Sequence, residues 1–139
     1  RRCPNDVFHK DPRILEILII LRVKYTLSQN DAKISGRYFE TVKKTIRFIK
    51  ENYHTKITLD GLAKKVYTDK FSLSKKFKAV TGSTIIEYIN SYRCEKAIEL
   101  IREGSPVNEA ATKCGFNNMS FFTRTFKAHT GKLPSEYKK

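Results

Sequence analysis

The stretch that decides the fold is GFNNMSFFTRTFK, residues 115–127. Gly115 can adopt positive φ angles that other residues resist, and Asn117 and Asn118 are both favourable N-cap residues. A helix is therefore expected to begin directly after a tight turn. Phe122 and Phe126 stand four residues apart and predict a buried face. The other face carries mixed, mostly polar side chains: Met119, Ser120, Thr123, Arg124 and Lys127. Such a helix suits the DNA major groove, although any amphipathic surface helix has a polar face.

The chain contains the same device twice. FKAVTG at residues 77–82 and FKAHTG at residues 126–131 match at five of six positions, at a separation of 49 residues. Upstream, each copy has a short apolar helix and a turn. Self-similarity at this period indicates a duplicated supersecondary unit, and helix, short turn, helix is the helix-turn-helix form. The sequence therefore predicts an all-α fold with two helix-turn-helix subdomains.

Capping residues and apolar periodicity place the expected helices. They cover about residues 38–53, 59–66, 70–80 and 84–102, followed by a short helix from Ser105-Pro106 and the helix after Asn118. Thr58 and Asp69 are expected to cap their helices, and Ser105 is expected to cap the second unit with Pro106 in its first turn. The first helix-turn-helix then covers about 58–80 and the second about 106–129. The helix 84–102 joins the two units and can hold them at a fixed separation.

The second helix of the first unit has its own outward face. Leu73 and Phe77 are expected to face inward, and the outward residues are Lys70, Phe71, Ser74, Lys75 and Lys78. Lysine is a flexible point charge without the planar fork of arginine, so these lysines suit phosphate contacts better than base contacts.

Arg124 is the strongest candidate for reading a base, because an arginine in mid-helix can bind guanine through two hydrogen bonds. The alternative is a solvated charge, or an ion pair with Glu103 or Glu109. Met119, Ser120 and Thr123 either contact thymine methyl groups and base edges or take no part. Phe121 favours packing over base stacking.

Charge supports a polyanionic partner. The net charge is +14, and residues 41–139 contribute +11 of it, from twenty Lys and Arg against nine Asp and Glu. This asymmetry marks the C-terminal part as the polyanion-binding part. A highly soluble protein with solvated lysines is the alternative.

Several classes of function are disfavoured. Cys3, Cys94 and Cys114 lie far apart without a C-x-x-C motif, and the three histidines are isolated, so we expect no metal, no cofactor and no enzyme activity. Cys114 matches Val66 of the first copy and is expected to be a small buried residue in a reduced, cytoplasmic protein. No apolar run is long enough to span a membrane.

Residues 13–29 form a second expected feature, a strongly apolar helix with ten apolar residues among positions 13–27. Three packing partners are open: a part of a longer protein, a second copy across a homodimer through residues 13–27, or residues 41–139. Residues 28–36 are expected to be a polar linker and a domain boundary. Residues 1–36 are therefore interpreted as the tail of a missing N-terminal sensing or dimerisation domain.

Residues 39–139 resemble the DNA-binding domain of AraC/XylS-type bacterial transcription regulators. The motifs that carry the resemblance are ATKCGF at 111–116, SFFTRTFK at 120–127, TG at 130–131 and PSEY at 134–137, with a looser match at 62–82. Ser72 and Lys76 depart from the family pattern, which has an aromatic and an apolar residue there. The resemblance implies seven helices, with recognition helices at Lys70–Lys78 and at Asn118–Lys127 inserted into successive major-groove segments. It also implies double-stranded DNA and RNA polymerase as partners and a nucleoid-associated location.

A protein-interaction module that keeps this fold is the rival interpretation, and the apolar Met119 favours it slightly. Acidic or apolar recognition helices would indicate a protein partner. The outward faces here instead carry cations, so the DNA interpretation is favoured: Lys70, Lys75, Lys78, Arg124 and Lys127.

Overall fold

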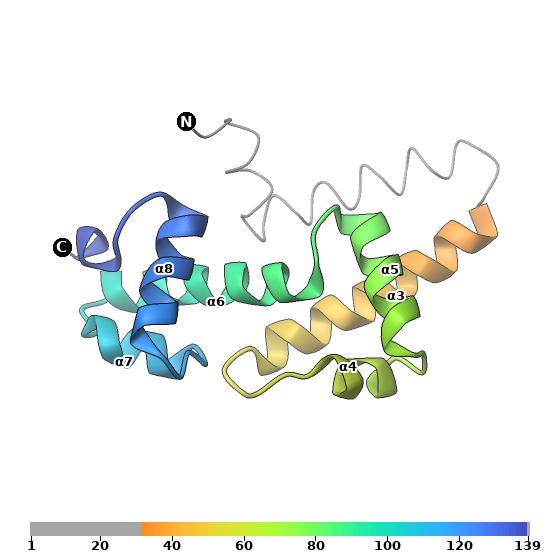
Figure 1. The fold of residues 1–139 in the computed structure, drawn as a ribbon, viewed down its shortest axis with the longest axis horizontal. Coiled ribbons are helices and arrows are strands. Elements are labelled where there is room, and N and C mark those ends of the chain that lie inside the picture. Colours follow the sequence, from red (N-terminus) through yellow and green to blue (C-terminus); the bar gives the residue numbers. More distant parts are fainter. Residues whose placement is uncertain (1–31, 139) are drawn as a thin grey trace.

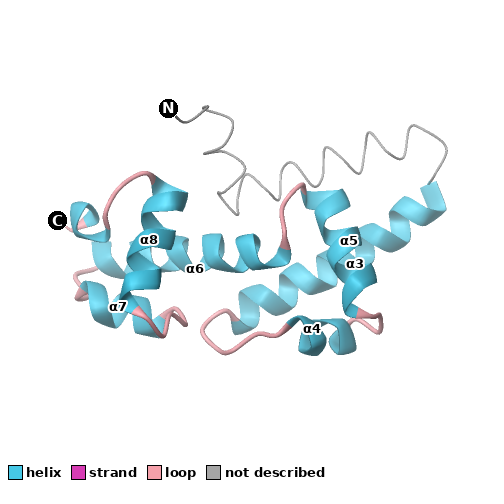
Figure 2. Ribbon diagram, viewed as in Figure 1, coloured by secondary structure: helices cyan, strands magenta, loops and turns pink. Residues whose placement is uncertain are grey.

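The computed structural model describes residues 32–138, and every regular element in that range is helical (Figures 1 and 2). The elements are α3 (Ala32–Asn52), α4 (Leu59–Lys65), α5 (Lys70–Thr81), α6 (Ile85–Arg102), α7 (Val107–Lys113), α8 (Met119–Thr130) and the 3-10 turn η1 (Pro134–Tyr137). The predicted all-α fold is confirmed for this part of the chain. The apolar helix predicted at 13–29 and its possible homodimer contact lie outside the described residues.

The first described helix begins earlier than the sequence pattern indicates. The helix is expected from about residue 38, whereas α3 already begins at Ala32, so the predicted helix start is wrong; the interpretation of residues 28–36 as a linker stays a prediction. Gly36 costs a helix up to ~1 kcal/mol relative to alanine, but good helix formers such as Ala32 and Arg37 lie near it. Gly36 also has no positive φ that would end the helix. The domain boundary near residue 36 stays a prediction.

Side-chain caps fix where the later helices start. The caps predicted at Thr58, Asp69 and Asn118 are confirmed, and Thr84 caps α6 in the same way. Their oxygens accept backbone N–H groups of the first turn at 2.9–3.1 Å. Each cap satisfies one of the N–H groups that a helix start leaves unpaired.

The cap predicted at Ser105 is wrong. Pro106 is the N-cap of α7, and no side chain caps that helix. Ser105 instead closes α6: its N–H donates to the carbonyl of Leu100 (3.0 Å), and the N–H of Gly104 donates to that of Ile101 (3.1 Å). Gly104 has a φ of 103°, as the residue after a helix C-cap commonly requires.

The repeat in the sequence is a repeat in the structure. α5 and α8 both end at a Thr-Gly pair, and Gly82 and Gly131 have φ angles of 78° and 82°. The hydroxyl of Thr81 donates to the carbonyl of Phe77, and that of Thr130 donates to the carbonyl of Phe126, both at 2.8 Å. The same residues therefore end α5 and α8 in the same way.

Two buried clusters make up the core, and α6 contributes to both. The first lies among α3, α4, α5 and the start of α6, with Ile49, Leu73, Phe77 and Tyr88 among its members. The second lies among α6, α7 and α8: Cys94, Ala97, Ala111, Cys114, Phe116, Phe122 and Phe126. Figure 1 shows α6 running between the two units. The predictions that Cys114, Phe122 and Phe126 are buried are confirmed.

Aromatic rings bind the second unit together. The ring of Phe122 lies 4.8 Å from that of Phe116 and 5.4 Å from that of Phe126, and Phe126 lies 5.4 Å from Tyr137 in η1. Truncating a buried phenylalanine to alanine typically costs about 3–5 kcal/mol. The inward face of α8 therefore fixes that helix firmly, which leaves its outward face at a defined position.

Candidate nucleic-acid interface

The outward face of α8 is open to solvent. Met119, Ser120, Arg124 and Lys127 are exposed, and Thr123 is half-buried with its hydroxyl donating to the carbonyl of Met119 (2.9 Å). The side-chain oxygen of Asn118 accepts a hydrogen bond from the N–H of Phe121, so this residue caps α8. Phe121 itself is 43% exposed and leans on Phe116, with ring centroids 6.3 Å apart.

Arg124 makes no ion pair with a carboxylate of the described residues, Glu103 and Glu109 included. Its Nε lies 3.4 Å from the carbonyl oxygen of Ser120, which is a long hydrogen bond on its own helix. Of the alternatives, the ion pair thus finds no support within residues 32–138, and the guanidinium lies where an external acceptor can reach it.

The outward face of α5 carries cations around an exposed ring. Lys75 and Lys78 are exposed, and Ser74 is half-buried. Phe71 is 78% exposed, and the ammonium of Lys70 lies 5.6 Å from the centre of its ring. Lys70 also lies 3.8 Å from a carboxylate oxygen of Asp60, and an exposed pair of that length contributes little to stability.

The helices α5 and α8 lie on the same side of the molecule. In the view of Figure 1, α5 crosses in front of α3, and α8 crosses in front of α6. The eleven residues predicted to contact DNA all lie on these two helices or at the cap of α8. Their role in DNA binding stays a prediction, because no nucleic acid is present.

The turns that precede α5 and α8 both place a residue of positive φ directly after the C-cap of the preceding helix. Gly115 has a φ of 95°, and its N–H donates to the carbonyl of Thr112 (3.1 Å). Tyr67 occupies the matching place with a φ of 56°, and it is the one non-glycine residue of positive φ in residues 32–138. Its ring is 94% exposed beside α5. Tyr67 was not among the candidate surface residues identified from the sequence.

Arg93 links the two units, and sequence reasoning missed it. From the middle of α6, its Nε and Nη2 donate to the backbone carbonyl oxygens of Tyr53 (2.7 Å) and Thr55 (2.8 Å), in the loop after α3. Burial lowers the pKa of the guanidinium from its ordinary value. The available sequence signal was a cation on α6 directly before Cys94, which is buried.

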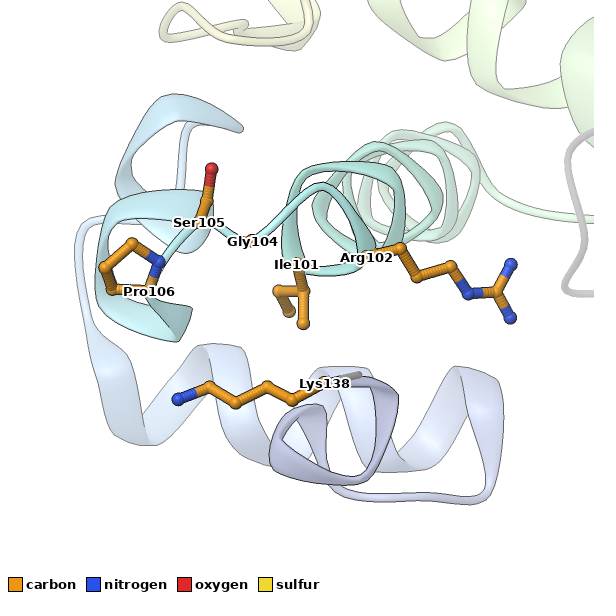
Figure 3. A pocket seen from close by; sticks show the side chains of 6 residues that line it. All are labelled: Ile101, Arg102, Gly104, Ser105, Pro106 and Lys138. Carbon is orange, nitrogen blue, oxygen red and sulfur yellow. The ribbon is translucent and has the colours of Figure 1, made fainter.

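Two surface hollows are poorly suited to binding a small ligand. One, of about 230 Å³, is lined by Ile101, Arg102, Gly104, Ser105, Pro106 and Lys138. The side chains of Arg102, Ser105 and Lys138 point in three different directions there, so no polar groups converge on it (Figure 3). The other is an open hollow of about 370 Å³ over the outer side of α7, lined by Asn108, Glu109, Thr112 and Lys113.

Residues 32–138 contain neither a candidate membrane-spanning helix nor a candidate metal-binding cluster. None of the helices in that range is long and apolar enough to cross a membrane. Nor does that range bring together three His, Cys, Asp or Glu side chains in an arrangement that could hold a metal ion.

Comparison with known proteins decides the family. A family model described as a helix-turn-helix domain matches residues 62–139, from α4 to the C-terminal residue. The chain belongs to the AraC family of helix-turn-helix domains. The resemblance noted in the sequence is thereby confirmed, and the match includes both α5 and α8 of this AraC-type domain.

Individual AraC-type relatives extend the comparison. The transcriptional regulatory protein HptR of Staphylococcus aureus is 31% identical over 69% of this chain and 38% of its own length. A solved structure of a probable AraC family transcriptional regulator from Rhodopseudomonas palustris is 25% identical, with a TM-score of 0.66 over 70% of this chain and 94% of that one. The DNA-binding domain of AdpA, a global transcriptional factor solved with a target DNA, shares the fold at 23% identity and a TM-score of 0.65, over 69% of this chain and 87% of that one.

The chain spans about two fifths to three fifths of the length of the curated relatives it matches, with values between 38% and 58%. Those relatives therefore contain further sequence that this AraC-type chain does not match.

Proposed function

We propose that this chain is the DNA-binding part of a bacterial transcription regulator, and that α5 and α8 enter successive major-groove segments of a promoter. The observation that carries the proposal is a pair of repeated helices, α5 and α8, that carry exposed cationic side chains and cross in front of α3 and α6 in the view of Figure 1. The family match and the DNA complex of the AdpA domain support it. A major groove is wide enough to admit an α-helix.

The two helices are proposed to contribute differently. On α8, Arg124 reads a base edge, with Ser120, Thr123 and Met119 beside it against base edges or thymine methyl groups, and Asn118 and Lys127 at the phosphates. On α5, Lys70, Lys75 and Lys78 neutralise phosphates, while Ser74 and Phe71 face the groove. An arginine can donate two hydrogen bonds to one guanine, whereas a lysine offers a mobile charge to any nearby phosphate.

The spacing of the two contacts follows from B-DNA. Recognition helices that meet one face of the duplex lie about 34 Å apart, one helical turn. We therefore expect a site with two half-sites whose centres are about ten base pairs apart.

Selection of duplex DNA from a random library by the purified chain, at stated salt, tests the proposal. A defined sequence with two half-sites is expected. With about five to eight phosphates neutralised, log K should fall with log salt at about −0.9 per phosphate. Lys44→Ala, which removes one positive charge from α3, is the charge-matched control for alanine substitutions of Lys70, Lys75 and Lys78 on α5. A flat salt response, or no enriched sequence, refutes DNA reading and favours a protein partner.

The longer relatives lead to a further part of the proposal. The complete regulator carries a sensing or dimerisation domain besides this one and acts on RNA polymerase at the promoter, in the cytoplasm with the nucleoid. The homodimer through residues 13–27 is tested separately. Leu18→Glu should alter the oligomeric state while leaving the fold of residues 41–139 intact, and a wild-type chain that sediments as a monomer would contradict it.

A further inference from the structure

The end of α3 and the loop after it contact both units. α3 belongs to the first core through Val42, Ile46 and Ile49, but Tyr53 at its end packs against the second core. The ring of Tyr53 meets that of Tyr92 on α6 edge to face, with centroids 5.3 Å apart. The loop therefore leaves the first unit and contacts the second.

Arg93 fastens this loop to α6. Its two hydrogen bonds, to the carbonyl oxygens of Tyr53 and Thr55, join residues 38 to 40 positions apart in sequence. A bond from a charged donor is roughly twice as strong as a neutral one, and here the guanidinium is half-buried. Both acceptors are backbone atoms, so the bonds hold the course of the chain itself.

The second helix-turn-helix closes over the same bonds. A Cβ atom on Gly115 would lie 2.8 Å from the carbonyl oxygen of Tyr53 and 3.1 Å from Nε of Arg93. The turn that leads into α8 thus sits directly against the atoms that Arg93 ties together. One hydrogen-bonded group touches the end of α3, the middle of α6 and the turn before α8.

This arrangement gives the two units a second attachment. α6 alone is a single rod, and bending or twisting it would change the offset between α5 and α8. A connection beside the rod removes that freedom, because both attachments must then move together. We propose that Arg93 is a positioning residue that fixes the placement of the two recognition helices and thereby sets the half-site spacing that the chain accepts.

The inference rests on the proposed DNA binding for its functional consequence. One inserted base pair shifts the second half-site by about 3.4 Å and rotates it by roughly a tenth of a turn. A rigid pair of units cannot follow that shift, so one helix loses its contacts. A pair freed from the Arg93 bonds can follow it at little cost.

The test uses the selected duplex and versions with one base pair inserted or removed between the half-sites. The wild-type chain should lose about tenfold or more in affinity on the altered duplexes, as expected when one unit loses its base contacts. Arg93→Ala should lose less than about threefold between the same duplexes, while selecting the same bases within each half-site. Arg93→Lys, which keeps the charge but not the two-pronged geometry, should lie between them.

Ile89→Val serves as the control for lost stability, because it removes one methylene from the first core and leaves Arg93 untouched. It should lower the melting temperature and keep the wild-type spacing preference. An Arg93→Ala chain that binds with the wild-type dependence on spacing overturns the inference while leaving the proposed function intact.

A measurement without DNA tests the role of Arg93 separately from the proposed DNA binding. Spin labels placed by Lys44→Cys on α3 and Thr112→Cys on α7, in a Cys3→Ser background, report the distance between the units. Cys94 and Cys114 are buried and should not be labelled. Arg93→Ala should broaden the distance distribution. An unchanged distribution refutes the inference that Arg93 fixes the placement of the two units. If the wild-type chain selects no DNA, the proposed function fails, and the distance distribution still decides whether Arg93 holds the units.

Discussion

Replacing Gly115 by alanine should destabilise the domain more than the same change at Gly131. Each glycine lies just after the end of a helix, and each has a positive φ angle, 95° at Gly115 and 82° at Gly131. Left-handed backbone costs a non-glycine residue about 1–2 kcal/mol, and the stiffer unfolded chain returns about 0.4–1 kcal/mol. At Gly131 nothing lies within 4 Å of the new Cβ, so a net loss of about 1 kcal/mol is expected there.

At Gly115 crowding adds to this loss. The new Cβ would lie 2.8 Å from a backbone oxygen, that of Tyr53, and backbone cannot swing aside as a side-chain tip can. Overpacking of this kind typically costs about 1–3 kcal/mol, which gives a total of about 2–4 kcal/mol.

Thermal unfolding followed by circular dichroism measures the difference. In a domain of this size 1 kcal/mol moves the melting temperature by about 4–8 °C. Gly131→Ala should therefore lower it by about that much, and Gly115→Ala by at least about twice as much. Equal shifts in the two variants would refute the reasoning, because they would mean that the loop at Tyr53 moves away without cost.

Three further predictions concern the recognition helices, their turns and the buried thiols. Arg124→Ala should cost about 1–3 kcal/mol on the preferred site and relax discrimination at one or two base pairs, whereas Lys75→Ala should weaken all sequences evenly and reduce the salt slope by about one. Titrations on matched and scrambled sites check this, and the reverse pattern would exchange the two roles. Tyr67→Gly should raise the free energy of unfolding by up to about 1 kcal/mol, because it relieves left-handed strain and the exposed ring packs on little. A loss of stability in urea titrations would contradict that. Burial raises the pKa of Cys94 to about 12 and that of Cys114 to about 11, from an ordinary 9.0. The unfolded chain thus releases these protons first, so stability should fall as pH rises from about 9 toward 11, by at most ~1.4 kcal/mol per unit for each thiol. Cys94→Ala and Cys114→Ala in combination should flatten this dependence, and an unchanged slope would mean that other groups cause it.

Helix starts were predictable because their signals are local. Thr58, Asp69 and Asn118 each bond an N–H group three residues ahead, so the sequence alone contains both partners. The same reasoning misplaced Ser105, because a serine before proline is compatible with two local structures. The end of α6 decided between them through its bonds back to Leu100 and Ile101.

Features that depend on distant partners were not predictable. The sequence indicates that Gly115 favours positive φ, but nothing in it shows that Tyr53 approaches from 62 residues away. Arg93 escaped notice for a related reason, since its acceptors are backbone carbonyls, which leave no mark on residue type. Lys76 departs from the family pattern, and its ammonium lies 5.2 Å from the ring centre of Tyr38 on α3.

The sharing of α6 by both cores has a consequence for how the domain opens. Tyr88 and Ile89 close the first core, while Cys94, less than two turns further on, and Ala97 close the second. Although the sequence is a tandem duplication, neither copy holds a complete interior, so a cut near Ser91 would leave two fragments with open cores. Melting of either half exposes apolar surface of the helix that the other half needs. Backbone amides in the middle of α6 should therefore exchange with solvent only when the whole domain unfolds, whereas those of η1 and the start of α3 exchange through local fraying.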